Sequence, residues 1–124
     1  MLTFARSTWE AAAGALAVAF PDPAQLAGLS DLVGQGRAEV FAVNRGGRTL
    51  GFAALGVEVG GVVVYGLAGG GAGLIDAVHE FAAEVARAAG LSHVRAFSAR
   101  PGLWRRLARR GWREAGRVLR YEVA

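Results

Sequence analysis

The sequence predicts an α/β fold in one domain, with a mixed, mostly antiparallel central sheet flanked by helices. The chain has 124 residues, the usual size of a single domain. Residues 39–44, 49–59 and 62–67 are rich in Val, Phe and Leu, and turns at Asn44–Gly47 and Gly60–Gly61 separate them, which predicts an antiparallel meander. The segment 62–67 is apolar on both faces, so that strand should be central. The glycine-rich loop, helix and strand that follow form a β-α-β unit, which predicts one parallel pair.

The N-terminal part is expected to form a short strand and two helices. Residues 1–6 make the strand, and a hydroxyl of Ser7–Thr8 caps a helix over 9–20. Two prolines end that helix, because each disfavours helix in the residue before it. Asp22 then caps a second helix over 23–33, with proline at its first position.

The C-terminal part alternates between helix and strand. Apolar residues follow helical spacing over 74–89, and Gly90 ends that helix. A strand is expected at 92–98, a short helix at 102–110, and one last strand region at 112–123, where Gly116 could introduce a bulge or bend.

Composition excludes several classes of site and location. The chain has no cysteine, so disulfides and thiolate metal sites are absent. Its two histidines, His79 and His93, lie far apart in sequence with no cluster of carboxylates beside them, which predicts no metal site. Every apolar run is too short to cross a membrane, so we expect no membrane span and a cytoplasmic protein.

The positive charge is concentrated at the C-terminal end. Residues 1–90 hold five arginines and eight acidic residues, whereas residues 91–124 hold nine arginines and two glutamates. This basic third leaves nucleic-acid binding open as an alternative. No helix-turn-helix, zinc or ribonucleoprotein motif accompanies it, and aromatic residues do not interleave as a stacking platform requires.

From residue 62 onward the chain resembles the GNAT family of acyl-CoA-dependent N-acetyltransferases. A hydrophobic strand leads into a glycine loop, an amphipathic helix, a strand and a short helix, and then into Gly111-Trp112 before the last strand. In the family, the short helix typically ends with Gly and an aromatic residue. The resemblance implies the acyl-CoA N-acyltransferase fold, acetyl-CoA as cofactor and an amine as substrate.

The resemblance also implies a cofactor site. The family motif is Gln/Arg-x-x-Gly-x-Gly/Ala; Gly71 and Gly73 match its glycines, and Ala68 replaces its first residue. Unhindered backbone N–H groups at a helix N-terminus form an anion site for a pyrophosphate, although a plain glycine-rich loop is the competing interpretation. Arg100 or Arg105 would pair with phosphates, the alternative being a solvated basic face. The expected cofactor-binding residues are Leu67, Ala68, Gly69, Gly70, Gly71, Ala72, Gly73, Leu74, Arg100 and Arg105.

The catalytic residues are not identified by the sequence. Acetyl transfer needs a group that takes the amine proton and an acid that protonates the leaving thiolate. Many family members place a tyrosine acid where this chain has Leu107. Either Glu58 or Glu39 could act as the base through a water molecule, and the alternative for each is a solvated or edge-strand residue. Tyr65 could donate a proton, and the alternative is a core residue with its hydroxyl hydrogen-bonded. His79 is expected to be an exposed structural residue.

Two functions from different classes remain. The first is an acetyl-CoA-dependent N-acetyltransferase that acts on an unknown amine. The second is a catalytically degenerate GNAT-like protein with a binding or structural role, similar to some encoded in bacteriophage and prophage gene clusters. Exposed sheet edges in this fold class often pair, which leaves a homodimer open.

Overall fold

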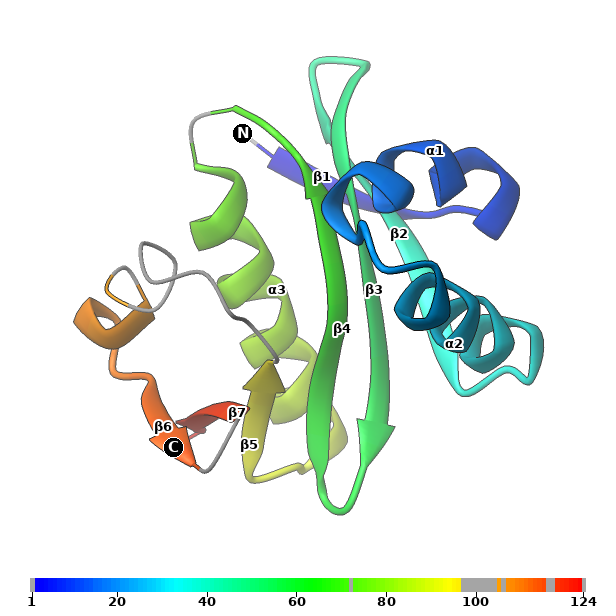
Figure 1. Cartoon of the computed structure of the whole chain (residues 1–124). Helices are drawn as coiled ribbons and strands as arrows, with labels where there is room; N and C mark the ends of the chain where they lie inside the picture. The colour runs from blue at the N-terminus through cyan, green and yellow to red at the C-terminus, as the bar shows by residue number, and fades with distance from the viewer. Residues whose placement is uncertain (1, 72, 97–104, 106, 116–117, 124) are drawn as a thin grey trace.

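The computed structural model describes residues 2–71, 73–96, 105, 107–115 and 118–123. The described strands form one sheet in the order β1-β2-β3-β4-β5-β7-β6, with helices on both faces (Figure 1). The elements are β1 (Leu2–Arg6), α1 (Trp9–Ala19), α2 (Pro23–Gly34), β2 (Ala38–Arg45), β3 (Arg48–Glu58), β4 (Gly61–Gly69), α3 (Leu74–Ala89), β5 (His93–Ala96), β6 (Arg113–Ala115) and β7 (Val118–Glu122).

The topology confirms the predicted fold class. Only β4 and β5 pair in parallel, and every other described pair of neighbouring strands is antiparallel. The predicted meander is β2, β3 and β4, and β4 lies at the centre of the sheet as its two apolar faces indicate. Helix α3 makes the connection between the parallel strands.

Helices α1 and α2 cover one face of the N-terminal half of the sheet. The Thr8 side chain caps α1 by accepting from the Ala11 N–H at 3.2 Å, and Asp22 caps α2 by accepting from the Ala24 N–H at 2.9 Å. Both caps were predicted. Helix α1 packs mainly on β4, β3 and β2, and α2 packs on β2. The core on this face includes Leu16 and Leu29.

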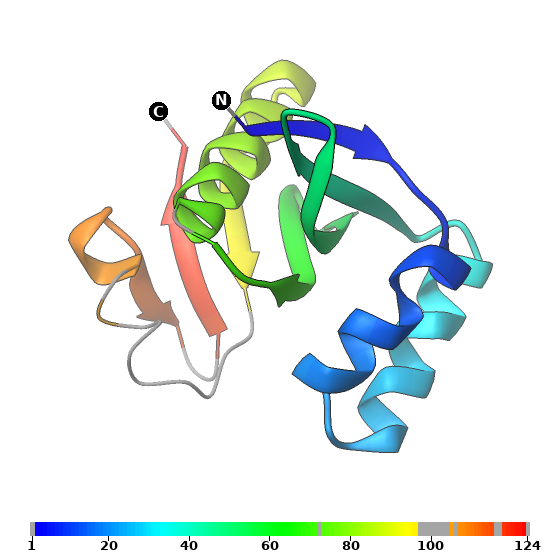
Figure 2. The same ribbon diagram turned by 90° about the horizontal axis from the view of Figure 1, so that it is seen from above.

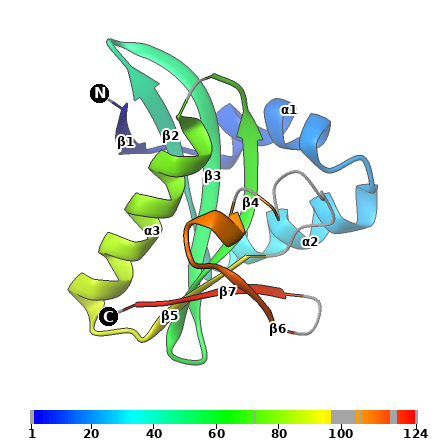
Figure 3. The same ribbon diagram turned by 90° about the vertical axis from the view of Figure 1, so that its left-hand side faces the viewer.

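Helix α3 covers the opposite face, so the sheet is the middle of three layers (Figure 2). Its buried side chains, among them Val78 and Ala82, pack with Val62 and Val94 of the sheet. It ends at Gly90, whose φ of 70° is the left-handed conformation that favours glycine. Viewed from that side, the C-terminal segment lies beside α3 (Figure 3).

One turn and one strand region differ from the prediction. The tight turn between β3 and β4 is made by Val59 and Gly60, with φ of 47° and 75°, and Gly61 already belongs to β4. A Cβ at Gly61 would overlap the His93 ring, so the second glycine serves close packing and not the turn. The region 112–123, predicted as one strand region with a bulge or bend at Gly116, contains two antiparallel strands, β6 and β7, and β7 pairs with β5; Gly116 itself lies outside the described residues.

Candidate functional site

The glycine-rich segment divides between a strand and a loop. The sequence predicted Ala68 and Gly69 to begin the glycine-rich loop, but both belong to β4, where Ala68 is buried and pairs with Phe52. The glycine loop proper begins at Gly70, whose N–H donates to the Leu50 carbonyl at 3.3 Å. Gly71 has a φ of 122°, which no side-chain-bearing residue adopts easily.

The loop ends at the N-terminus of α3, which has no side-chain cap. Gly73 occupies the N-cap position with a φ of 82° and makes no side-chain hydrogen bond. First-turn N–H groups of a helix without a cap are free to bind an anion, and the helix dipole favours negative charge there. The sequence predicted the glycine-rich loop that leads into this helix, and the Leu74 N–H donates to the Gly71 carbonyl of that loop at 3.4 Å.

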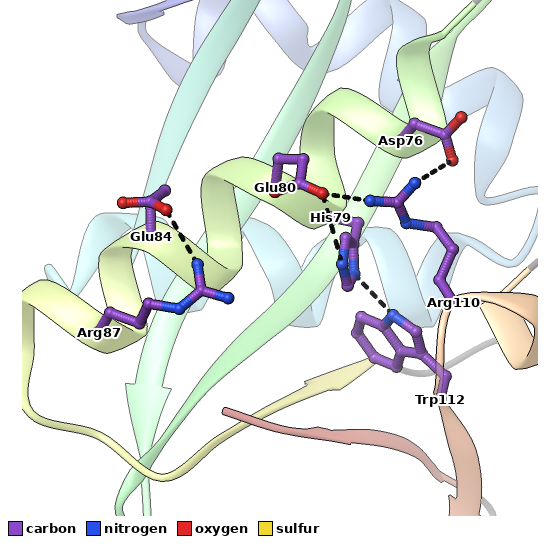
Figure 4. A network of polar contacts seen from close by, with 7 residues as sticks. All are labelled: Asp76, His79, Glu80, Glu84, Arg87, Arg110 and Trp112. Atoms are coloured by element: carbon purple, nitrogen blue, oxygen red, sulfur yellow. Dashed lines mark hydrogen bonds and ion pairs between the residues drawn. The ribbon is translucent and has the colours of Figure 1, made fainter. Parts of the chain in front are cut away.

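An arginine offsets the acidic residues near this helix end. Asp76 lies in the first turn of α3, where its charge would oppose a bound phosphate. Arg110 lies 3.4 Å from the Asp76 carboxylate and also pairs with Glu80 (Figure 4). The half-buried Arg110 therefore compensates the negative charge of α3 beside the glycine loop.

The other predicted cofactor residues have separate positions. Leu74 is buried in the core under α3, and Leu67 packs against the same core. Arg105 is exposed, as the solvated-face alternative describes. Ala72 and Arg100 lie outside the described residues.

A β-bulge interrupts β4 at Tyr65. Gly66 pairs with Ala54 and Val64 pairs with Leu55, so Tyr65 has no partner on β3. On its other side, β4 pairs with β5 only as far as Val64, and residues 65–69 have no described strand beside them there (Figure 1). This part of β4 presents backbone hydrogen-bonding groups to an extended ligand on one edge.

A polar pair lies at the bulge. The Tyr65 hydroxyl donates a hydrogen bond to the Glu58 carboxylate, and Arg37 lies 3.7 Å from the other carboxylate oxygen. Arg95 donates to the Glu58 backbone carbonyl at 2.7 Å. Burial, and then the Glu58 hydrogen bond, raise the pKa of Tyr65 to about 12, so its hydroxyl stays protonated at neutral pH. The Glu58 carboxylate therefore contacts Tyr65 and Arg37 and not solvent alone, and the Tyr65 hydroxyl has a hydrogen-bond acceptor.

Three other candidates have structural positions. Leu107, where many family members have a tyrosine, is buried in the core, only 5% exposed. Glu39 is exposed and pairs with Arg6 of the neighbouring edge strand. His79 was expected to be exposed but is buried, because Trp112 covers it and donates its indole N–H to Nδ1 at 2.7 Å (Figure 4).

Metal and membrane sites are not found in the described part of the chain. No three metal-ligating side chains gather among these residues. No helix within these ranges is long and apolar enough to cross a membrane.

Solved structures share this architecture along nearly the whole chain. An IAA acetyltransferase from Bacillus cereus is 17% identical, with a TM-score of 0.76 over 99% of this chain and 100% of that one. The fold is that of the GNAT acetyltransferases. The ribosomal-protein-S18-alanine N-acetyltransferase of Escherichia coli is 16% identical, with a TM-score of 0.75 over 100% of this chain and 95% of the other. A GNAT family acetyltransferase from Elizabethkingia anophelis with acetyl-CoA bound is 13% identical, with a TM-score of 0.71 over 93% and 78%.

Sequence similarity adds nothing to this likeness. No family model and no curated protein matches the amino-acid sequence. At identities this low, the GNAT likeness establishes the fold, and function must be argued from the site itself.

Sequence reasoning missed the polar side chains of β5 and β7. Arg95 and Arg120 pair directly across these strands, and His93 is buried beside them. The alternation of apolar Val94 and Tyr121 with these residues was visible in the sequence. The register between β5 and β7, which brings these side chains together, was not visible in the sequence.

Proposed function

We propose that this protein is an acetyl-CoA-dependent N-acetyltransferase that acts on an amine. The observation that carries the proposal is the continuity of three features in a GNAT fold. The edge of β4 after Val64, beside which no described strand lies, leads directly into the glycine loop, and the loop leads into the uncapped N-terminus of α3 (Figure 1). An extended ligand with a pyrophosphate at one end matches this sequence of features.

The residues of this region fit the cofactor. The pyrophosphate would bind the N–H groups of Gly71 and Gly73 and of the first turn of α3, where the two glycines leave the backbone accessible and the Gly70 N–H already donates to the Leu50 carbonyl. The pantetheine arm would take hydrogen bonds from the free edge of β4 over 65–69. Acetyl-CoA, when bound, supplies an acetyl group activated as a thioester. Arg105, exposed on the short C-terminal helix, remains a proposed phosphate contact.

The Glu58–Tyr65 pair supplies the proton acceptor in this proposal. Tyr65 stands at the bulge where the pairing of β4 with β5 ends, and its hydroxyl already donates to the Glu58 carboxylate. An amine that hydrogen-bonds to the Tyr65 oxygen passes a proton to that oxygen as the tyrosine proton moves to Glu58. The raised pKa of Tyr65 makes it a poor acid for a thiolate, so its role is that of a relay.

The test of cofactor binding is a calorimetric titration with acetyl-CoA. Gly70→Glu is the informative variant, because a Cβ at Gly70 meets nothing within 4 Å and its φ is not positive, so the new carboxylate blocks the loop without straining the backbone. Gly71 is a poorer choice because its φ of 122° strains any substitution. Gly28→Glu, also with open space around its Cβ but on α2, is the matched control.

We expect micromolar binding in the wild type and in Gly28→Glu, and a loss of at least about 100-fold in Gly70→Glu from charge repulsion and exclusion. Equal binding in all three proteins would show that the loop is not the cofactor site. No binding to any of them would leave the degenerate, non-catalytic GNAT-like protein as the better description, and nucleic acid and protein partners would then be screened.

The test of the relay compares Glu58→Gln with Glu39→Gln. Glu39 is an exposed glutamate on β2 and serves as the control. Removal of a general base lowers kcat by about 100- to 10,000-fold, so we expect this loss in Glu58→Gln with acetyl-CoA binding retained, and no loss in Glu39→Gln. Unchanged turnover in Glu58→Gln would eliminate this residue as the base.

A further inference from the structure

Three arginines share one face of the C-terminal half of the sheet. Val94 and Tyr121 pair with each other and pack into the core under α3. Because side chains alternate along strands, Arg95 and Arg120, which pair with each other at the next position, lie on the opposite face. Arg113 of β6 pairs with Arg120 and lies on that face too. We call Arg95, Arg113 and Arg120 the arginine face.

This face is accessible. Helices α1 and α2 lie on the same side of the sheet but pack mainly on β2, β3 and β4. The Arg113 side chain is 71% exposed and that of Arg120 is 37% exposed. Like charges at directly opposed positions repel, so the repeated arginine pairing lowers stability unless an anion offsets it.

Among the described residues, the N–H donors of the arginine face do not all have a hydrogen-bond acceptor. Glu122 lies 2.8 Å from Arg120 Nε and 3.4 Å from Arg113 Nη2, and it is the carboxylate of this cluster. Within the described ranges, the buried Nε of Arg95 has no hydrogen-bond acceptor, and the buried Nε of Arg120 has only the ion pair with Glu122. His93 beside them is neutral at pH 7, because burial and then Arg120 and Arg95 lower its pKa.

The arginine face adjoins the proposed catalytic pair. Arg95 donates to the Glu58 backbone carbonyl at 2.7 Å, and the Glu58 side chain accepts from Tyr65. The positively charged arginine face would therefore lie next to an amine bound at Tyr65, on the side of the amine that faces away from α1. A molecule with an amine and an anionic group at its two ends matches both.

We propose that the arginine face binds the anionic group of the acetyl acceptor, so that the substrate is an amine that carries a carboxylate or a phosphate. This inference rests on the proposed function for the identity of the reaction, but anion binding by the arginine face can be measured independently of catalysis. Arg120 and Arg113 bind the anion directly, and Arg95 holds Glu58 beside it.

The test follows the Nε–H signals of ¹⁵N-labelled arginine while small molecules are titrated. Glycine is compared with glycinamide for the carboxylate, and 2-aminoethyl phosphate with ethanolamine for the phosphate. We expect the member of at least one pair that carries the carboxylate or phosphate to shift the signals assigned to Arg120 and Arg113, and the members that lack an anionic group to shift none. The pair that responds identifies the anionic group.

Glu122→Gln is the decisive variant, since it removes the competing carboxylate and should tighten anion binding by about 10-fold, a gain that misfolding cannot produce. Arg120→Gln and the well-exposed Arg113→Gln should each weaken it by about 10- to 100-fold. Arg48→Gln, an exposed arginine in the β2–β3 hairpin, is the charge-matched control and should change nothing.

Several outcomes would overturn the proposal. Equal shifts from the members with and without an anionic group, or no shift from either the carboxylate or the phosphate compound, would remove the anion site. Shifts with duplex DNA but not with the small anions would make the face a nucleic-acid surface instead. If acetyl-CoA fails to bind while the anions still shift Arg120, the acetyltransferase function is wrong and the anion site remains.

Discussion

Lowering the pH should destabilise the protein through His79. Its Nδ1 accepts the Trp112 indole hydrogen at 2.7 Å, and the side chain is 7% exposed. Burial, followed by the charge of Arg110, lowers the pKa of His79 below the ordinary value of 6.5. The folded protein therefore takes up a proton on this ring less readily than the unfolded chain does.

The direction and the size of the change in unfolding free energy follow from this difference in proton binding. Below pH 6.5 the unfolded state binds more protons than the folded state, so the free energy of unfolding falls as pH falls. Above pH 6.5 neither state binds a proton on this ring and the contribution is constant. If His79 stays neutral in the folded protein, the loss at pH 5 reaches about 2 kcal/mol, at about 1.4 kcal/mol per pH unit.

The assay is urea unfolding followed by circular dichroism from pH 5 to 8. His93 also has a lowered pKa and contributes in the same direction, so the wild type is compared with His79→Gln. Glutamine can still accept from Trp112 but does not titrate. The stability gap between the two proteins should shrink by up to about 2 kcal/mol between pH 7.5 and pH 5. A gap that stays constant across this range would refute the role assigned to His79.

Two further predictions concern turn and strand geometry. Val59 is β-branched and has a φ of 47° in the two-residue turn that it forms with Gly60. Val59→Asn should therefore stabilise the protein by about 1 kcal/mol in thermal unfolding. A destabilised variant would mean that the turn is not strained. Gly61→Ala should destabilise it by about 1–3 kcal/mol because the new methyl group overlaps the His93 ring. Gly28→Ala, a helical glycine with open space, should instead stabilise by about 0.5–1 kcal/mol, and similar effects at both positions would contradict the packing at Gly61.

The local features of the fold could be predicted from the sequence. The caps Thr8 and Asp22, the C-terminal Gly90 and the central position of β4 follow from side-chain chemistry or from hydrophobic patterns within one segment. The glycine pattern also predicted the loop that leads into α3.

Long-range contacts account for what could not be predicted. His79 lies at the border of its helix, and its burial depends on Trp112, a residue 33 positions away in the chain. The separation of 112–123 into two strands depends on the pairing of β7 with β5. The bulge at Tyr65 depends on the register with β3, and the sequence carries no local sign of it.

The central claim is that the glycine loop and the free edge of β4 bind acetyl-CoA. The most direct measurement is a titration of ¹⁵N-labelled protein with acetyl-CoA, observed through the backbone amide signals. We predict that the largest shifts fall on Gly70, Gly71 and Gly73, on the first turn of α3 and on residues 65–69 of β4. Shifts confined to other elements, or no shift at millimolar acetyl-CoA in a folded sample, would contradict the account.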